Sequence, residues 1–104
     1  MLVEIRRYEI ESGRREEFVE FFDDEVVPEM SKVGMQILGQ FVSIENDTVF
    51  YFLRAFADEE QREVQTAAFY ESAVWLETLK ARALEMETGW MVELVTPTPG
   101  SAIR

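Results

Sequence analysis

The alternation of apolar and polar residues is clearest between Gly34 and Ala57, a segment that predicts two adjacent β-strands. Its two apolar runs, residues 35–44 and 49–57, are joined by the turn Glu45-Asn46-Asp47-Thr48. The second run reads VFYFLRAFA, and a strand so rich in aromatic and branched residues needs cover on both of its faces. A chain of this length covers one face with its own helices, so we expect a second subunit to cover the other.

The same two-residue period predicts a strand near each end of the chain. Residues 2–10 place Glu4, Arg6 and Tyr8 on one face, opposite apolar residues on the other. Residues 90–95 form the last strand, and the two prolines of the following TPTPGSAIR keep that tail out of a sheet interior.

Two helical regions are predicted between these strands, because apolar residues there recur every three or four positions. The first covers residues 14–32, and its apolar stripe comprises Phe18, Phe21, Phe22, Val26, Met30 and Val33. We expect Pro28 to kink or break this helix, since proline lacks a backbone N–H and clashes with the preceding turn. Gly34 suits the C-cap of the helix.

The second helical region begins with a capping box, in which Asp58 is the N-cap and Gln61 lies three residues later. Ser72 is a further N-cap candidate, so the region is either one helix or two helices with a break near Tyr70. The end of the region is expected at Gly89.

The order of elements is strand, helix, strand, strand, helix pair, strand, which makes two β-α-β halves. Right-handed crossovers without knots give a four-stranded antiparallel sheet in the spatial order 4-1-3-2, with the helices on one face. The predicted fold class is therefore α+β, a ferredoxin-like βαββαβ plait. We expect one domain at residues 1–97 and a C-terminal tail at residues 98–104.

Strand alternation also predicts which side chains face the helices. The less polar set is assigned to that face: Val3, Ile5, Ile37, Phe41, Tyr51, Leu53, Val92 and Leu94. The other face then carries Glu4, Arg6, Tyr8, Gln36, Gln40, Phe50, Phe52, Arg54, Phe56, Met91 and Glu93. Three phenylalanines on a bare face would form a large exposed apolar patch, so we expect two such faces to pack together in a homodimer. The paired sheets would form a dimeric α+β barrel with a cavity between them.

Charge restricts the partners of the protein. With 21 acidic and 10 basic side chains the formal net charge is -11, which would repel a polyanion such as nucleic acid. A monomeric plait of the RNA-binding type is disfavoured for the same reason, and its basic, glycine-containing aromatic motif is missing. The first residues lack the apolar core of a signal peptide, and no apolar run is long enough for a membrane span. We therefore expect a cytoplasmic protein without membrane contact.

The absence of cysteine and histidine removes many types of active site. Thiolate nucleophiles, Ser-His and Cys-His pairs, the imidazole base and nearly all zinc sites need one of these residues. A carboxylate site for magnesium or calcium would need the spacing of a ligand loop. Asp23-Asp24-Glu25 and Asp58-Glu59-Glu60 lie in helix-like stretches instead. We expect no metal and no cofactor.

Several short segments, in this order and spacing, resemble those of one protein family. They are Val3-Glu4-Ile5-Arg6-Arg7-Tyr8, Gly13 with Phe18, Gly34-Met35, Phe52-Leu53-Arg54-Ala55-Phe56, Asp58-Glu59-x-x-Arg62, and Phe69-Tyr70-x-Ser72-x-x-Trp75. Together they extend over residues 2–97 and resemble the NIPSNAP family. The resemblance implies a dimeric α+β barrel, related in fold to small monooxygenases, cyclases and stress-response proteins. It implies no set of catalytic residues, and the missing cavity histidine disfavours haem degradation and peroxidase-like chemistry.

The predicted cavity suggests a site for a small molecule. Arg6 and Arg54 are expected to bind a carboxylate or another anion, and Gln40 to hydrogen-bond it. Phe50 and Phe52 are expected to enclose an apolar or aromatic body. The leading hypothesis is therefore a homodimer that binds a carboxylate-bearing or aromatic molecule, with cofactor-free catalysis as a further option.

If the protein is an enzyme, Glu4 is the expected general base, and Tyr8 is the expected proton donor to a developing enolate. Phenylalanine neighbours raise the pKa of a carboxylate by desolvation and arginine neighbours lower it, and the sequence leaves open which effect prevails. The structural alternative is that Glu4 or Glu93 neutralises the arginines and fixes the register of the dimer. The protein would then be an interaction or scaffolding module.

Three further features are expected to be structural. Trp75 and Trp90 are interpreted as aromatics of the core or of an interface. Arg62, four residues after Asp58, predicts an ion pair at the helix start, with a place at the cavity mouth as the alternative. The acidic run of residues 20–25 is interpreted as a solvated helix face.

Overall fold

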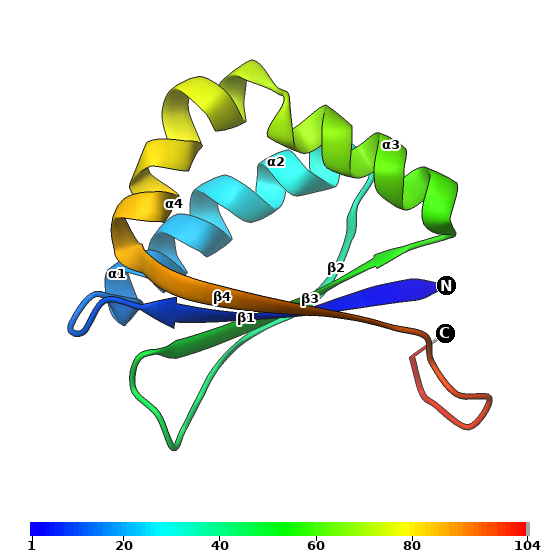
Figure 1. Cartoon of the computed structure of the whole chain (residues 1–104), viewed down its shortest axis with the longest axis horizontal. Coiled ribbons are helices and arrows are strands. Elements are labelled where there is room, and N and C mark those ends of the chain that lie inside the picture. Colours follow the sequence, from blue (N-terminus) through cyan, green and yellow to red (C-terminus); the bar gives the residue numbers. More distant parts are fainter. Residues whose placement is uncertain (104) are drawn as a thin grey trace.

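The computed structural model describes residues 1–103, which form an antiparallel sheet with all of its helices on one face (Figure 1). The four strands are β1 (Leu2–Ile10), β2 (Gln36–Val42), β3 (Val49–Phe56) and β4 (Glu87–Val95). They lie in the order β2-β3-β1-β4, which is the spatial order predicted from the sequence. The ferredoxin-like plait is thereby confirmed.

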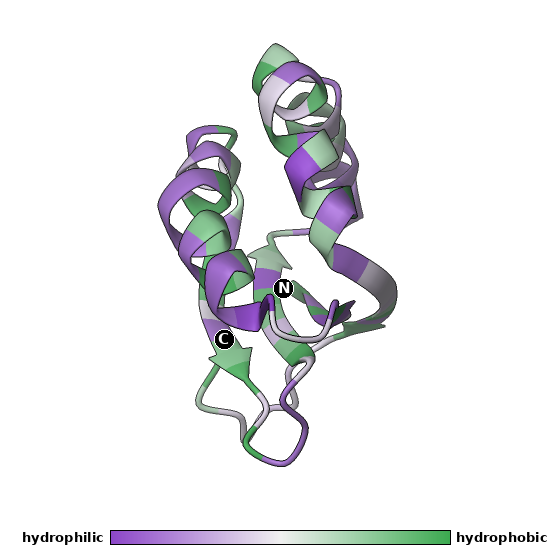
Figure 2. Cartoon of the chain, turned by 90° about the vertical axis from the view of Figure 1, so that its left-hand side faces the viewer, coloured by the Kyte–Doolittle hydropathy of each residue, from purple (hydrophilic) through white to green (hydrophobic). Residues whose placement is uncertain are grey.

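Two helical runs cover the sheet and stand side by side above the strands in Figure 2. The first run comprises α1 (Arg15–Phe21), the π-helical turn η1 (Phe22–Val26) and α2 (Val27–Lys32). The second comprises α3 (Glu59–Tyr70), the π-helical turn η2 (Trp75–Leu79) and α4 (Lys80–Met86). Within residues 1–103, none of these helices has the length and apolar character needed to cross a membrane.

The first helical run is not broken at Pro28. This proline lies in the first turn of α2, directly after η1, and the backbone of Val26 and Val27 stays helical. Proline cannot donate to the carbonyl one turn earlier, and a π turn changes the pattern of donors and acceptors at that point. The wider turn therefore carries the helix through the proline.

The first run ends at Gly34, as predicted. Its φ angle is +97°, a value that glycine adopts without strain. The N–H of Gly34 donates to the carbonyl of Ser31 at 3.0 Å, and the N–H of Met35 donates to that of Met30 at 3.2 Å. This pair of bonds is a Schellman motif, and it leads the chain directly into β2.

Both predicted caps of the second run are found. The side chain of Asp58 accepts a hydrogen bond from the backbone N–H of Gln61 at 2.8 Å. The hydroxyl of Ser72 accepts one from the N–H of Trp75 at 3.3 Å, so the chain turns between α3 and the helix that follows. The expected end at Gly89 is wrong, because α4 ends at Met86 and Gly89 lies within β4.

The predicted faces of β1 and β3 are wrong. Residues directly opposite in antiparallel strands share a face, and the register sets Arg6 against Phe52 and Tyr8 against Phe50. Phe50 and Phe52 are fully buried, and the ring of Phe22 in η1 lies 5.0 and 4.6 Å from theirs. The polar face of β1 and the phenylalanine face of β3 therefore lie beneath the helices.

The reason for this reversal is the size of the side chains. The phenylalanines of β3 bury more apolar surface together than the valine, tyrosine, leucine and alanine that alternate with them, so they pack against the aromatic stripe of the first helical run. Glu4 and Arg54 share the face of these phenylalanines and are buried with them. Polarity was a poor guide to the outer face, because Glu4 and Arg54 form an ion pair and are buried together.

The open face of the sheet has its own apolar surface. Ile5, Phe41 and Met91 are 36%, 53% and 67% exposed, and Glu93 pairs opposite Ile5. The placement of Met91 and Glu93 on the outer face, predicted from the sequence, is therefore confirmed.

Replacing one phenylalanine on each face tests this arrangement. Phe50→Ala should lower the free energy of unfolding by about 3–5 kcal/mol, because truncating a fully buried phenylalanine leaves a cavity. Phe41→Ala should change it by about 0.5 kcal/mol or less, since Phe41 is half exposed. Chemical denaturation of the dilute protein measures both values. A larger cost for Phe41→Ala than for Phe50→Ala would contradict the assignment of the faces.

Candidate ligand-binding site

The carboxylate of Glu4 binds three arginines beneath the helices. Its Oε1 accepts hydrogen bonds from Arg6 Nη1 at 2.6 Å and from Arg54 Nε at 2.9 Å. Its Oε2 accepts one from Arg62 Nε at 2.8 Å. Glu4 and Arg54 are each 1% exposed. Arg62 is 31% exposed and also pairs with Glu59, so the interior part of the cluster holds two guanidinium groups, those of Arg6 and Arg54, against one buried carboxylate.

Three elements supply this cluster. Glu4 and Arg6 lie on β1, Arg54 lies directly opposite Glu4 on β3, and Arg62 lies in the first half of α3. The cluster connects groups within one chain, so the prediction that these charges line a cavity between two sheets is wrong. Arg62 is bound to Glu4 and lies 3.5 Å from Glu59, whereas its expected ion pair with Asp58 is not formed.

Glu4 is poorly suited to the expected role of general base. Burial by itself would raise the pKa of its carboxyl, but the charge of Arg54 and the hydrogen bonds from Arg62 and Arg6 outweigh burial. The pKa of Glu4 therefore lies below its usual value. A carboxylate held by three guanidinium groups is a weak base.

Arg54 does not line the cavity, but it orients Tyr70, which does. Its Nη1 donates to the hydroxyl oxygen of Tyr70 at 3.1 Å and approaches the sulfurs of Met30 and Met35 at 3.9 and 3.6 Å. These two methionines flank the Schellman motif at the end of α2. Arg54 thereby links the end of α2 to the end of α3.

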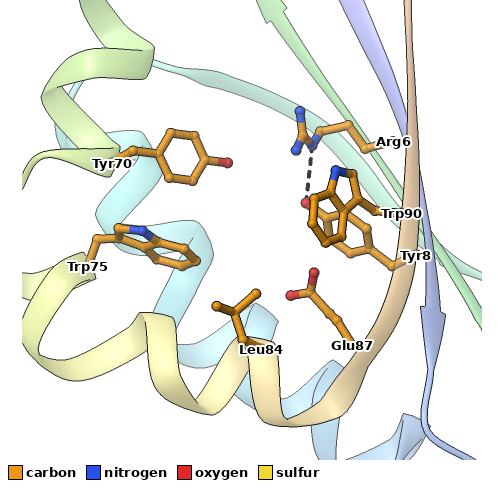
Figure 3. A pocket seen from close by; sticks show the side chains of 7 residues that line it. All are labelled: Arg6, Tyr8, Tyr70, Trp75, Leu84, Glu87 and Trp90. Atoms are coloured by element: carbon orange, nitrogen blue, oxygen red, sulfur yellow. Dashed lines mark hydrogen bonds between the residues drawn. The ribbon is translucent and has the colours of Figure 1, made fainter.

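A cavity of about 170 Å³ lies between the sheet and the second helical run and opens to solvent beside Leu84 and Trp90, which are 48% and 61% exposed (Figure 3). Its wall is formed by Arg6, Tyr8, Tyr70, Trp75, Leu84, Glu87 and Trp90. A chamber of about 20 Å³ shares four of these residues and reaches Phe22 and Val26 in η1. An apolar cavity of about 150 Å³ can hold a benzene molecule, and about 10–15 Å³ is enough for one water. The outer space therefore fits one aromatic ring with a small substituent.

Both π-helical turns border this space. η2 contributes Trp75 to the cavity, and η1 contributes Phe22 and Val26 to the inner chamber. Turns of this type occur frequently at functional sites. The position of these two turns therefore supports a site here without reference to the charged residues.

Hydrogen-bond donors converge on the cavity. Arg6 Nε donates to the hydroxyl oxygen of Tyr8 at 3.1 Å, and Figure 3 shows the hydroxyl of Tyr70 pointing across the cavity toward Arg6. Neither tyrosine hydroxyl donates to an acceptor within residues 1–103. Burial raises the pKa of Tyr8 to about 12, so its hydroxyl keeps its proton at neutral pH. Both tyrosines can therefore donate to a ligand.

Glu87 brings a carboxyl group to the same cavity. It is the first residue of β4, and its side chain points into the space between Tyr8 and Leu84 (Figure 3). In the part of the chain that the structure describes, no side chain hydrogen-bonds to this carboxyl. Burial raises the pKa of Glu87 to about 7, although the charge of Arg6 acts in the opposite direction. About half of the Glu87 side chains are then protonated near neutral pH.

Two of the predicted site residues line the cavity, namely Arg6 and Tyr8. Gln40 does not, because its Nε2 donates to Asp23 Oδ1 at 3.0 Å on the side of the first helical run. Phe50 and Phe52 belong to the aromatic core. Their predicted role in enclosing a ligand is replaced by residues of the second helical run and β4.

Sequence reasoning missed Tyr70, Leu84 and Glu87 as cavity residues, and it assigned Trp75 and Trp90 to the core or an interface. The expected helix end at Gly89 placed Glu87 in a helix and so concealed its position on the sheet. Ser72 could have indicated that Tyr70 and Trp75 lie close together, because a helix break at Ser72 places them on either side of one turn.

Acidic side chains in residues 1–103 form no group of three or more that could hold a metal ion.

Comparisons with known proteins agree with this fold. Residues 3–101 match the model of the NIPSNAP family. The structure of an uncharacterized NIPSNAP domain protein from Burkholderia xenovorans has a TM-score of 0.89 at 20% identity, covering 97% of this chain and 98% of that chain. A NIPSNAP family protein of unknown function from Agrobacterium tumefaciens has a TM-score of 0.90 at 20% identity, with coverages of 100% and 94%.

A third structure, described as an antibiotic biosynthesis monooxygenase, has a TM-score of 0.71 at 16% identity and covers 95% of this chain and 100% of that chain. At this identity the likeness shows a shared fold. No functionally curated protein matches the chain. The family model covers nearly the whole sequence and agrees with the motifs found in it, so the chain belongs to the NIPSNAP family.

Proposed function

We propose that this protein binds a small molecule with one anionic group and a flat apolar body, in the cavity between its own sheet and its second helical run. The excess of guanidinium groups around Glu4 carries this proposal. Arg6 belongs to that cluster and also lines the cavity. An incoming carboxylate would offset the excess charge and form a charge-assisted hydrogen bond with Arg6.

The polar groups around Arg6 suit a planar anion. Nη2 of Arg6 makes no hydrogen bond within residues 1–103, and the guanidinium is only partly exposed. The hydroxyl protons of Tyr8 and Tyr70 are available beside it. A carboxylate has two oxygens in one plane, so it can accept from the guanidinium and from a tyrosine together.

The remaining walls suit a flat apolar body. Trp75, Leu84 and Trp90 face the cavity, and the ring of Trp75 packs edge-on against Tyr70 at a centroid distance of 5.2 Å. Aromatic walls fixed by such contacts favour an aromatic or other flat group. The neighbour described as a monooxygenase supports a small-molecule role through the shared fold alone.

We also propose that the chain forms a homodimer through the open face of the sheet. Ile5, Phe41 and Met91 expose apolar surface there, and this face carries both Arg7 and Glu93. A face with apolar residues and opposite charges is self-complementary, as a two-fold interface requires. In this dimer the ligand cavity of each chain lies on the helix side, away from the interface.

Removing the guanidinium of Arg6 tests the binding proposal. Phenylacetate, one aromatic ring with a carboxylate, should bind to the wild type, and Arg6→Met should weaken its binding about tenfold or more. Arg7→Met is the matched control, because Arg7 is the next residue of β1 and faces the open side. The two tryptophans of the chain both line the cavity, so quenching of tryptophan fluorescence reports binding. Equal affinities of the two variants would contradict the proposal.

Binding should also depend on pH. Burial raises the pKa of Glu87 to about 7, so its carboxylate loses its charge as the pH falls from about 8 to about 6 and stops repelling an anion. By linkage, the affinity for phenylacetate should rise over this range and a proton should be taken up on binding. Glu87→Gln should bind tightly at both pH values. Fluorescence titration measures the change, and a wild-type affinity that falls on acidification would refute this role of Glu87.

The dimer can be tested with a charge on each side of the sheet. Phe41→Glu, on the open face, should convert a dimer into a monomer, since two carboxylates would be forced into an apolar contact. Leu76→Glu should remain dimeric, because Leu76 has the same 53% exposure but lies on η2. Sedimentation velocity measures the mass of each variant. A monomeric wild type, or equal behaviour of both variants, would exclude this interface.

A further inference from the structure

A carboxylate in the cavity is unexpected if the protein only binds an anion. Glu87 would repel such a ligand when it is ionised, and no hydrogen bond or ion pair to another described residue gives it a structural role, although the charge of Arg6 acts on it. Its position at the junction of α4 and β4 aims it at the same space as Arg6 and the two tyrosine hydroxyls (Figure 3). The cavity thus combines three kinds of group: one that binds an anion, donors for an oxygen, and a proton acceptor.

Building on the binding function proposed above, we propose that the protein catalyses the enolisation of an aromatic 2-oxo acid, with Glu87 as the group that removes and returns the proton. Such a substrate has a carboxylate, a carbonyl, a CH₂ group and a ring in series. With its carboxylate on Arg6, the carbonyl oxygen faces Tyr8 and Tyr70. The ring then lies against the tryptophans, which leaves the CH₂ group for Glu87.

The step needs no further reactant. The carboxylate of Glu87 takes one proton from the CH₂ carbon, and the electrons of that C–H bond form a carbon–carbon double bond. The electrons of the carbonyl double bond move to its oxygen, and the resulting enolate accepts hydrogen bonds from Tyr8 and Tyr70. The proton on Glu87 exchanges with solvent, and Glu87 then protonates the enolate oxygen or the carbon, which gives the enol or the ketone.

The surroundings of Glu87 suit both the removal and the return of a proton. The titratable groups that face it are Arg6 and Tyr8 on β1 and Tyr70 at the end of α3, while η2 and α4 contribute Trp75 and Leu84. Burial brings the pKa of Glu87 close to neutrality, where a general base is most effective. Tyr8 stays protonated, so it remains a donor to the enolate.

Exchange of the CH₂ protons of phenylpyruvate in D₂O, followed by proton NMR, tests this activity. The wild type should accelerate exchange above the rate in buffer, and kcat/KM should rise with pH through about 7 as Glu87 ionises in the free enzyme. Glu87→Gln should reduce kcat about a hundredfold or more while it still binds phenylacetate. Tyr8→Phe should lower kcat about tenfold or more with a smaller change in KM. Circular dichroism verifies that each variant is folded.

The matched control is Glu77→Gln, which removes an exposed carboxylate of η2 outside the cavity and should exchange phenylpyruvate at the wild-type rate. A wild type that binds phenylacetate but exchanges no faster than buffer would overturn the enolisation and leave the binding function standing. A wild type that binds neither compound would overturn the binding function itself. Full exchange activity in Glu87→Gln would exclude Glu87 as the base.

Discussion

The carboxylate of Glu4 is the interaction on which the arrangement of the interior depends. It is the only acidic group bound to the guanidinium groups of both Arg6 and Arg54 among the described residues, and it also accepts from Arg62. A buried charge without a partner costs several kcal/mol, so the positions of β1, β3 and α3 are coupled through this one group. The cluster therefore does two things. It holds the layers in register, and it orients Arg6 and, through Arg54, Tyr70 toward the cavity.

Two carboxyl groups on neighbouring strands have opposite surroundings. Glu4 is held by three guanidinium groups, and its pKa is lowered; Glu87 has none bound to it, and burial raises its pKa to about 7. Arg6 connects the two groups, because it binds the carboxylate of Glu4 and its charge acts on the pKa of Glu87. The fixed charge organises the structure, and the movable proton is available for chemistry.

Local sequence patterns were sufficient for the order of the elements, the caps at Asp58 and Ser72, and the family. These features depend on residues close together in the chain. The faces of β1 and β3 were not predictable from alternation, because Phe52 and Arg54 share one face and give opposite indications. Only the packing of Phe22 and the closure of the charge cluster decide between them, and both involve contacts over long sequence separations.

The candidate site was predicted only in part, because it too depends on contacts between residues far apart in the sequence. Arg6 and Tyr8 were found because a charged and a hydroxyl-bearing residue on a strand are unusual beside so many aromatics. Glu87 was missed because α4 passes into β4 without an intervening loop, so no glycine or proline marks the change. The convergence of Tyr70 and Trp75 follows from the turn at Ser72, which the sequence suggested without showing where the two rings would point.

The wall of the cavity has two parts: one lies on the sheet, and the other lies at the connection between α3 and η2. Arg6 and Tyr8, which bind the anion, lie on β1 and are fixed by the sheet, whereas Tyr70 and Trp75 flank a short connection that contributes no strand pairing. Substitutions or insertions at this joint would reshape the wall around the ligand body without disturbing the charge balance at Glu4. Changes at this connection would therefore alter which ligand body fits, while the contact between Arg6 and the anionic group of the ligand is kept.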